Sequence, residues 1–302
     1  MEKNAVVEIR NLNKYYGKHH VLKDVSFDIY ENEIVGFIGP NGAGKSTTMK
    51  CICNLIFPTS GSIKVCGFDL KREREKALAS QASLIESPGL YPTMSGLENL
   101  QLFASLRNVS KERVDELIEF TNLGRKIYLA TGKYFMGMKQ RLALAIVLLS
   151  KPRFIILDEP TNGLDPKGIV ELRNTLRNLV MQENLSILFS SHQLGEIEKL
   201  ADRIICINKG QIIPTPSVFG ERFSYRLQLS LGANAQQVFS AIVGIISIEE
   251  LDMENYKVVL NNETVLSKIL AEFLSQGIQI LDIAKESYDI ETIYQEIYSG
   301  AL

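Results

Sequence analysis

The sequence predicts an α/β fold, with a largely parallel sheet covered by helices and a smaller α+β domain after it. From residue 34 onward, short apolar runs rich in β-branched residues alternate with amphipathic stretches, which is typical of strands separated by helices. A glycine-rich segment follows the first run, and an acidic pair ends another. With 302 residues and 45% hydrophobic content, the chain is long enough for one large domain and an appendage.

The elements of the larger domain are assigned in chain order. Residues 6–10 and 26–30 alternate apolar and polar side chains, which predicts an antiparallel edge of the main sheet. Buried strands are predicted at 34–38, 154–157, 185–189 and 203–207. Three helical patterns then follow one another without a strand, at 96–107, 111–121 and 137–149. We therefore expect a helical insertion over about residues 86–150.

Two closely spaced prolines, Pro214 and Pro216, predict a boundary between a core domain at 1–215 and an accessory domain at 216–302. The predicted elements of the second domain are strands at 223–230, 246–251, 255–260 and 278–283 and helices at 234–243, 263–275 and 289–298. This β-α-β-β-α-β order is that of a ferredoxin-like unit. No chemical motif lies in it, so we interpret it as an accessory or dimerisation domain.

The charge balance argues against a nucleic-acid-binding protein. Lys and Arg total 33 and Asp and Glu total 35, so the formal net charge is −2 and no overall basic field exists. The N-terminus shows no secretory signal, and the longest apolar run, 142–149, is far shorter than the roughly 20 residues that span a bilayer. The four cysteines, at 51, 53, 66 and 206, lack metal-ligand spacing. We expect reduced, buried thiols in a cytoplasmic protein.

The strongest motif is the segment Gly39-Pro-Asn-Gly-Ala-Gly-Lys-Ser-Thr47, which follows the run 34–38 and precedes a helical stretch. It matches the phosphate-binding pattern G-x-x-x-x-G-K-[ST] in its strand–loop–helix context, and so predicts a P-loop NTPase core. Glycines let backbone N–H groups point at phosphate oxygens, and the helix dipole adds positive charge. The alternative is a glycine-rich turn without a ligand. The expected nucleotide-binding residues are Gly39, Asn41, Gly42, Ala43, Gly44, Lys45, Ser46 and Thr47.

Within this loop, Lys45 would meet the β- and γ-phosphates and Ser46 would hold Mg²⁺. A second motif places Asp158 and Glu159 after the run 154–157, at the strand end where α/β sheets bind ligands. Asp158 would hold Mg²⁺, and Glu159 would orient or deprotonate the water that attacks the γ-phosphate. Without the phosphate loop, the pair would be interpreted as a solvated strand end. His192, after another apolar run, is by itself typical of an ordinary strand-end histidine.

Taken in order, the segments 39–47, 154–161, 162–165 and 191–192 resemble the nucleotide-binding subunit of ABC transporters, over about residues 5–215. The resemblance implies an ATPase that uses ATP and Mg²⁺. Two such subunits sandwich ATP between the P-loop of one and the signature helix of the other, so a second ATPase subunit, identical or different, is expected. The other expected partner is an integral-membrane permease, which would hold the chain at the cytoplasmic face of the membrane.

The resemblance also implies roles for single residues. Asp158 would be the Walker B carboxylate, Glu159 the catalytic base and His192 the switch histidine that senses the γ-phosphate. Asp165 would belong to the D-loop. Tyr16, just before a glycine, falls where an aromatic ring stacks on adenine in this family; the alternative is a half-buried strand-end tyrosine.

A first departure from the family pattern is Glu86, which stands where the family usually has a glutamine that links the core to the helical insertion. A glutamate there resembles the branch that exports peptide antibiotics, the bacitracin-resistance and lantibiotic-immunity transporters. Asn99 and the segments 137–141 and 160–165 are similar to that branch as well. A carboxylate keeps an acceptor but loses a donor, so Glu86 would still hold metal or water. The alternative is a solvated loop charge.

The second departure concerns the signature, normally Leu-Ser-Gly-Gly-Gln, which falls on Tyr134, Phe135, Met136, Gly137 and Met138. The signature serine donates to the γ-phosphate of ATP bound on the opposing subunit, and Phe135 cannot. A charge-assisted hydrogen bond of this kind contributes roughly 1.5–3 kcal/mol, so the closed dimer should be weakened. We expect slow ATP turnover, or a composite site completed by a partner with a better signature.

By resemblance, the cargo is a peptide antibiotic moved outward for immunity or resistance. Two other functions stay open at this point. One is a soluble ABC-type ATPase of translation or DNA repair, against which the single P-loop and the lack of a basic excess argue. The other is a catalytically weak regulatory nucleotide switch, which Phe135 favours and the intact Asp158, Glu159 and His192 oppose.

Overall fold

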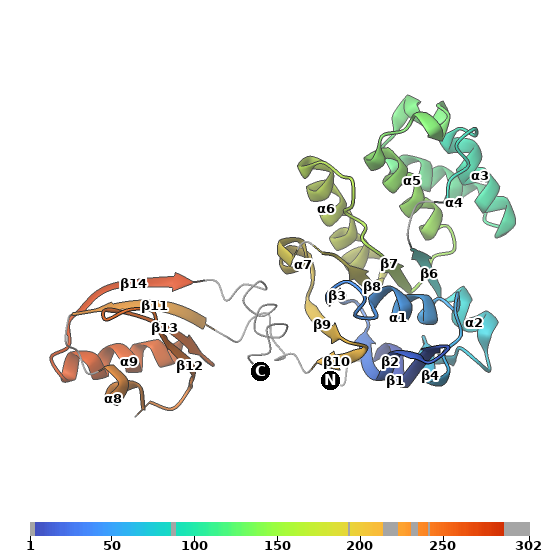
Figure 1. Ribbon diagram of the computed structural model, residues 1–302. Coiled ribbons are helices and arrows are strands. Elements are labelled where there is room, and N and C mark those ends of the chain that lie inside the picture. The colour runs from blue at the N-terminus through green and yellow to red at the C-terminus, as the bar shows by residue number, and fades with distance from the viewer. Residues whose placement is uncertain are drawn as a thin grey trace. The chain divides into compact units, whose positions relative to one another are not determined.

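The computed structural model describes residues 4–85, 89–192, 194–213, 223–230, 235–240 and 242–286. Glu86 and the helix predicted at 289–298 lie outside these residues. The chain divides into two compact units, residues 1–215 and 216–302, and Figure 1 shows the elements of each.

The first unit is built on a six-stranded sheet with the order β10-β9-β3-β8-β7-β6. Its strands are β3 (Ile34–Ile38), β6 (Gln81–Leu84), β7 (Phe154–Leu157), β8 (Ser186–Ser190), β9 (Arg203–Asn208) and β10 (Gln211–Ile213). All neighbouring pairs are parallel except β9 and β10. Every residue of β3, β7 and β8 is buried, which explains their nearly continuous apolar sequences. The predicted α/β fold class is confirmed.

The antiparallel strands expected at the edge of the main sheet instead form a sheet of their own. The order is β2-β1-β4-β5, from β1 (Ala5–Tyr16), β2 (His19–Tyr30), β4 (Ser60–Val65) and β5 (Phe68–Asp69). The sheet is separate because, among the described residues, β1 pairs with β2 and β4 and with no strand of the six-stranded sheet. The alternating side chains of β1 and β2 bury Val7, Ile9 and Ile29 in one hydrophobic cluster with Phe37 of β3. The two sheets also meet through a backbone hydrogen bond of 2.8 Å from the Lys23 N–H to the Gly210 carbonyl.

The helical insertion contains α3 (Gly96–Leu106), α4 (Lys111–Thr121) and α5 (Met136–Leu148), and each bound lies within one residue of the prediction. Ser95 and Glu98 form a capping box at the start of α3, and Ser110 caps α4, which fixes where these helices begin. Two 3₁₀ turns, Gly124–Tyr128 and Thr131–Lys133, connect α4 to α5. The remaining helices of this unit are α1 (Lys45–Ile52), α2 (Arg74–Ala79), α6 (Pro166–Glu183) and α7 (Leu194–Leu200).

The second unit has the predicted β-α-β-β-α-β order. Its elements are β11 (Phe223–Leu229), α8 (Ala235–Ser240), β12 (Ile245–Glu250), β13 (Asn255–Leu260), α9 (Thr264–Ser275) and β14 (Ile280–Glu286). The strands pair antiparallel in the order β12-β13-β11-β14, which is the ferredoxin-like arrangement. Phe239 of α8 and Phe273 of α9 pack with Leu227 and Val258 of the sheet. Within the described residues of either unit, no helix combines the length and apolarity needed to cross a bilayer.

Candidate functional site

The candidate site lies where three neighbouring parallel strands end. β3, β8 and β7 are adjacent in the sheet, and their carboxyl ends lie at the same edge. The phosphate-loop candidate leaves β3 at Gly39, Asp158 follows β7, and His192 lies just beyond β8. The carboxyl edge of an open α/β sheet is where such folds bind ligands, so the topology brings the main sequence motifs together.

The backbone of the 39–47 loop requires its glycines. A Cβ atom on Gly39 would lie 2.3 Å from the carbonyl oxygen of Ile207, and Gly44 has a left-handed φ of +114°. Gly44 is the residue immediately before α1, and no acidic residue occupies the first turn of that helix. The loop is therefore a backbone cradle at a helix N-terminus, and its shape and charge suit phosphate oxygens.

Lys45, the first residue of α1, is half-buried in this cradle. Its Nζ donates to the Gly39 carbonyl at 2.6 Å and to the Pro40 carbonyl at 3.3 Å. Burial lowers the pKa of Lys45, and the nearby Glu159 and Asp158 carboxylates oppose that change. The ammonium group therefore lies within the electrostatic reach of both acidic residues, and a phosphate would give it a further anionic partner.

Asp158 and Glu159 are held in a tight turn directly after β7. Glu159 has a φ of +52°, a left-handed conformation that residues with side chains rarely adopt. Ser190 at the end of β8 donates from Oγ to Asp158 Oδ1 at 2.6 Å and accepts the Glu159 N–H at 2.9 Å. We predicted the acidic pair from the sequence but assigned no role to Ser190.

His192 contacts the carboxylate of Glu159. Its Nδ1 lies 2.7 Å from Glu159 Oε2, and its backbone N–H donates to the same oxygen at 3.2 Å. The side chain of Glu159 is 25% exposed and that of His192 is 57% exposed, so the pair borders solvent. Lys45, Asp158, Glu159 and His192 thus form one cluster of complementary charges and hydrogen bonds.

Asp158 and Ser46 offer oxygen donors of the kind that a magnesium ion takes. Asp158 offers a carboxylate and Ser46 an exposed hydroxyl in the first turn of α1. Among the described residues, no group of three or more His, Cys, Asp or Glu side chains is placed to hold a metal. A small oxygen donor set suits Mg²⁺, because this ion keeps several of its waters and takes only one or two protein ligands.

The five signature-position residues lie at the start of α5. Tyr134 is buried, and its hydroxyl donates to the Lys126 carbonyl at 2.9 Å. Phe135 is the residue that caps α5, but it makes no side-chain cap hydrogen bond and is 81% exposed. Met136, Gly137 and Met138 form the first turn of the helix. A ring without a hydrogen-bonding group therefore stands where a polar cap would satisfy the helix N-terminus.

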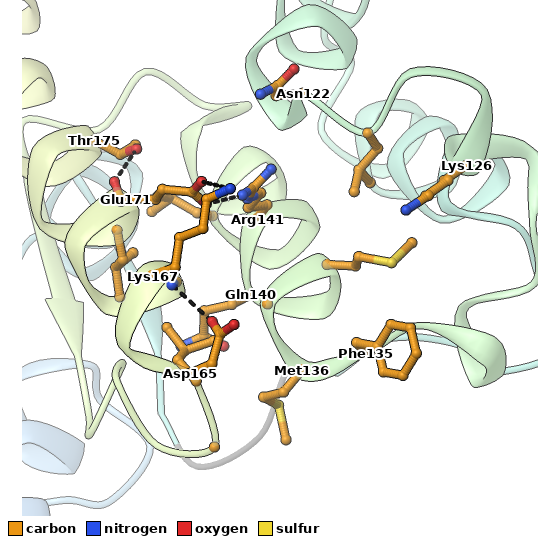
Figure 2. A pocket seen from close by; sticks show the side chains of 18 of the residues that line it. Asn122, Lys126, Phe135, Met136, Gln140, Arg141, Asp165, Lys167, Glu171 and Thr175 are labelled. Atoms are coloured by element: carbon orange, nitrogen blue, oxygen red, sulfur yellow. Dashed lines mark hydrogen bonds and ion pairs between the residues drawn. The ribbon is translucent and has the colours of Figure 1, made fainter.

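Asp165 caps α6, where its Oδ1 accepts the Gly168 N–H at 2.8 Å. The starts of α5 and α6 line one groove of about 1010 Å³, and Figure 2 shows Phe135, Met136 and Asp165 along it. An ion pair between Arg141 of α5 and Glu171 of α6 crosses this groove. None of the residues that line this groove belongs to the Lys45 cluster, so the groove is a second candidate site.

Two other predicted residues lie apart from these contacts. Tyr16 ends β1, is 50% exposed, and carries Lys14 Nζ at 4.9 Å from its ring centre. This half-exposed position at a strand end fits the alternative interpretation, and Lys14 already contacts the ring, so the adenine-stacking role of Tyr16 stays a prediction. Glu86 lies outside the described residues, so its metal or coupling role stays a prediction.

Comparison with known proteins connects this geometry to a family. A family model described as "ABC transporter" matches residues 22–162, and one described as "AAA domain, putative AbiEii toxin, Type IV TA system" matches residues 136–198. The ABC transporter ATP-binding protein YhcH of Bacillus subtilis is 41% identical over 72% of each chain. The bacitracin transport ATP-binding protein BcrA of Bacillus licheniformis is 32% identical over 98% of each chain. The lantibiotic transport ATP-binding protein SrtF of Streptococcus pyogenes is 41% identical over 69% of this chain and 89% of its own.

Solved structures agree with the sequence relatives. The ATP-binding subunit of an ABC transporter superimposes with a TM-score of 0.65 at 30% identity, covering 70% of this chain and 90% of its own. The ATP-binding cassette MJ0796, solved as a dimer with ADP and Pi, gives a TM-score of 0.63 at 25% identity over 71% of this chain and 99% of its own. Together with the phosphate cradle and the acidic cluster, these similarities show that the chain belongs to the ATP-binding ATPase subunits of ABC transporters.

Proposed function

We propose that the chain is the ATP-hydrolysing subunit of a transporter that exports a peptide antibiotic related to bacitracin or the lantibiotics, for immunity or resistance. The observation that carries this proposal is the match to BcrA of Bacillus licheniformis, a bacitracin transport protein, over 98% of both chains. That match extends through the ferredoxin-like unit and is not limited to the ATP-binding core. The lantibiotic transport protein SrtF supports the same substrate class.

The Lys45 cluster supplies the residues for hydrolysis. The loop N–H groups and Lys45 would bind the β- and γ-phosphates, and Tyr16 would stack on adenine. Ser46 and Asp158 would hold Mg²⁺, which neutralises phosphate charge when bound. Glu159 would orient and deprotonate the attacking water, and His192 would hold the Glu159 carboxylate through the 2.7 Å contact while it meets the γ-phosphate.

The groove at the starts of α5 and α6 supports a dimeric mechanism. A phosphate bound at the Lys45 cluster of one subunit would face the signature position and Asp165 of another, so each chain contributes two half-sites. We propose that a second ATPase subunit completes the site and that a separate membrane permease carries the substrate. The chain would then be held at the cytoplasmic face of the membrane by that permease.

Substitution of the proposed base tests the catalytic assignment. Glu159→Gln keeps the size of the side chain but removes the base, so ATP turnover should fall by about 100-fold or more, within the usual range for general base catalysis. The measurement is phosphate release by the purified protein with Mg²⁺ and ATP. Nucleotide binding, followed with a fluorescent ATP analogue, should be retained. Turnover at the parent rate would contradict the role of Glu159.

Co-expression of the chain with a candidate membrane permease tests the transport assignment. Cells that carry both proteins should survive higher bacitracin or lantibiotic concentrations, and cells with the Glu159→Gln variant should not. Fractionation of the native cells addresses the alternative of a soluble ABC-type ATPase. Recovery of the chain in the membrane fraction only when the permease is present supports the proposal, and recovery in the soluble fraction under both conditions contradicts it.

A further inference from the structure

A buried serine of β8, Ser190, contacts both residues of the acidic pair. Its Oγ donates to Asp158 Oδ1 at 2.6 Å and accepts the backbone N–H of Glu159 at 2.9 Å. A serine hydroxyl has one donor and two acceptor sites, so both bonds form at the same time. Ser190 has 0% of its surface exposed, so bulk water does not compete for these bonds.

The pairing of β7 with β8 explains why a hydroxyl is needed at this place. The parallel ladder pairs Leu157 with Phe189 and then ends, because the chain turns away at Glu159 with a φ of +52°. The Glu159 N–H therefore leaves the ladder, and the Ser190 side chain accepts it in place of a backbone carbonyl. On its other side, the turn is fixed by the Asp158 N–H, which donates to the Leu84 carbonyl of β6 at 2.9 Å.

We propose that Ser190 is a positioning residue for ATP hydrolysis, which fixes the Asp158 carboxylate and the left-handed turn at Glu159 at the same time. The inference rests on the proposed roles of Asp158 and Glu159. Ser190 acts through these residues and does not contact the nucleotide. Because His192 follows the same strand and holds the Glu159 carboxylate, the end of β8 fixes both the backbone and the side chain of the base.

The chain offers a matched control on the same strand. Ser186, at the other end of β8, also has 0% exposure, and its Oγ accepts the N–H of Asn32 at 3.0 Å. Asn32 is also left-handed, with a φ of +59°. Ser186→Ala therefore removes the same kind of hydrogen bond from an equally buried position, but away from the carboxylates.

The experiment compares Ser190→Ala, Ser186→Ala and Ser190→Thr in the full chain. Loss of a buried hydrogen bond to a charged group should lower kcat by about tenfold or more in Ser190→Ala, with little change in the KM for ATP. The Mg²⁺ concentration for half-maximal turnover should rise several-fold, because Asp158 is less well oriented. Ser186→Ala should keep the kcat of the parent. Ser190→Thr retains the hydroxyl and should restore most of the lost rate.

A second measurement needs neither metal nor nucleotide. Hydrogen–deuterium exchange of the backbone segment 154–165 should accelerate in Ser190→Ala and stay unchanged in Ser186→Ala, because only the former frees the Glu159 N–H. Equal losses of kcat in both alanine variants, or parent kcat and parent exchange in Ser190→Ala, would overturn the inference. If Glu159→Gln hydrolyses ATP at the parent rate, the proposed base itself is wrong, which is a different outcome from an active Ser190→Ala beside an inactive Glu159→Gln.

Discussion

Replacement of Phe135 by serine should improve both the stability of the fold and the ATPase dimer. Phe135 precedes α5 with extended backbone angles and no side-chain cap bond, and 81% of its surface is exposed. Removal of the ring therefore costs little apolar burial. A serine at this N-cap would accept a first-turn N–H and stabilise the protein by about 1 kcal/mol, which corresponds to a rise in Tm of roughly 2–4 °C for a domain of this size.

The same hydroxyl would keep its proton available for a phosphate of ATP on the partner subunit. A hydrogen bond to a charged group contributes about 1.5–3 kcal/mol, which corresponds to roughly tenfold to 150-fold tighter nucleotide-driven association. We would measure thermal unfolding, ATP turnover, and ATP-dependent dimerisation by sedimentation. The dimerisation assay is best done in a Glu159→Gln background, where bound ATP should persist.

Two further variants at the same position separate the cap from the donor. Phe135→Asp caps the helix but repels phosphate, so the Tm should rise while ATP-dependent dimerisation falls. Phe135→Ala provides neither function and should resemble the parent in both measurements. If Phe135→Ser raises the Tm but leaves turnover and dimerisation unchanged, then the missing hydroxyl does not limit the dimer and our reasoning is refuted.

Two other predictions concern stability. Asp165→Ala removes the cap bond to Gly168 and should lower the free energy of unfolding by about 1 kcal/mol, measured by urea titration, whereas Asp165→Ser should keep most of it. Burial raises the pKa of Cys51 to about 11 and those of Cys53 and Cys206 to about 12, from an ordinary 9.0. The thiols hold their protons more tightly in the folded chain than in the unfolded chain. Their contribution to the free energy of unfolding is therefore fully present below pH 9 and declines above it. Urea titrations across that range should show a shallower decline when the three cysteines are replaced by alanine.

The helices and strands that could be predicted from the sequence are those that carry a local signal, either a run of buried apolar residues or a capping residue. β3 and β7 are buried on both faces, and α3 begins at a capping box, so composition and cap residues identify them. β6 carries the sequence Gln-Ala-Ser-Leu, which has no β-branched residue, and it is a strand because it pairs with β7. Its conformation is imposed by tertiary pairing, which a local pattern cannot reveal.

In the candidate site, too, contiguous motifs could be predicted and contacts that depend on strand pairing could not. The motif around Lys45 and the acidic pair are continuous in sequence, so their chemistry could be predicted. The part played by Ser190 depends on the register between β7 and β8 and on the left-handed φ of Glu159. Neither quantity is encoded in residue spacing. The N-terminal strands form a second sheet and not the expected edge of the main sheet for a similar reason, because alternation marks a strand but does not select its neighbours.

A hydrogen bond from α5 connects the groove to the turn that holds Asp158 and Glu159. Gln140 is buried and lies two residues after Met138, the last signature position. Its Nε2 donates to the Pro160 carbonyl at 2.5 Å, and Pro160 directly follows Glu159. The Arg141–Glu171 ion pair joins the same helix to α6, whose cap is Asp165. A phosphate on a partner subunit that binds the start of α5 would therefore act on a helix already hydrogen-bonded to the turn that carries the proposed base, Glu159. The Phe135 side chain supplies no hydrogen-bond donor at the start of α5, but the bond from Gln140 to Pro160 and the Arg141–Glu171 ion pair are both present. A serine introduced at position 135 would therefore act through contacts that already exist.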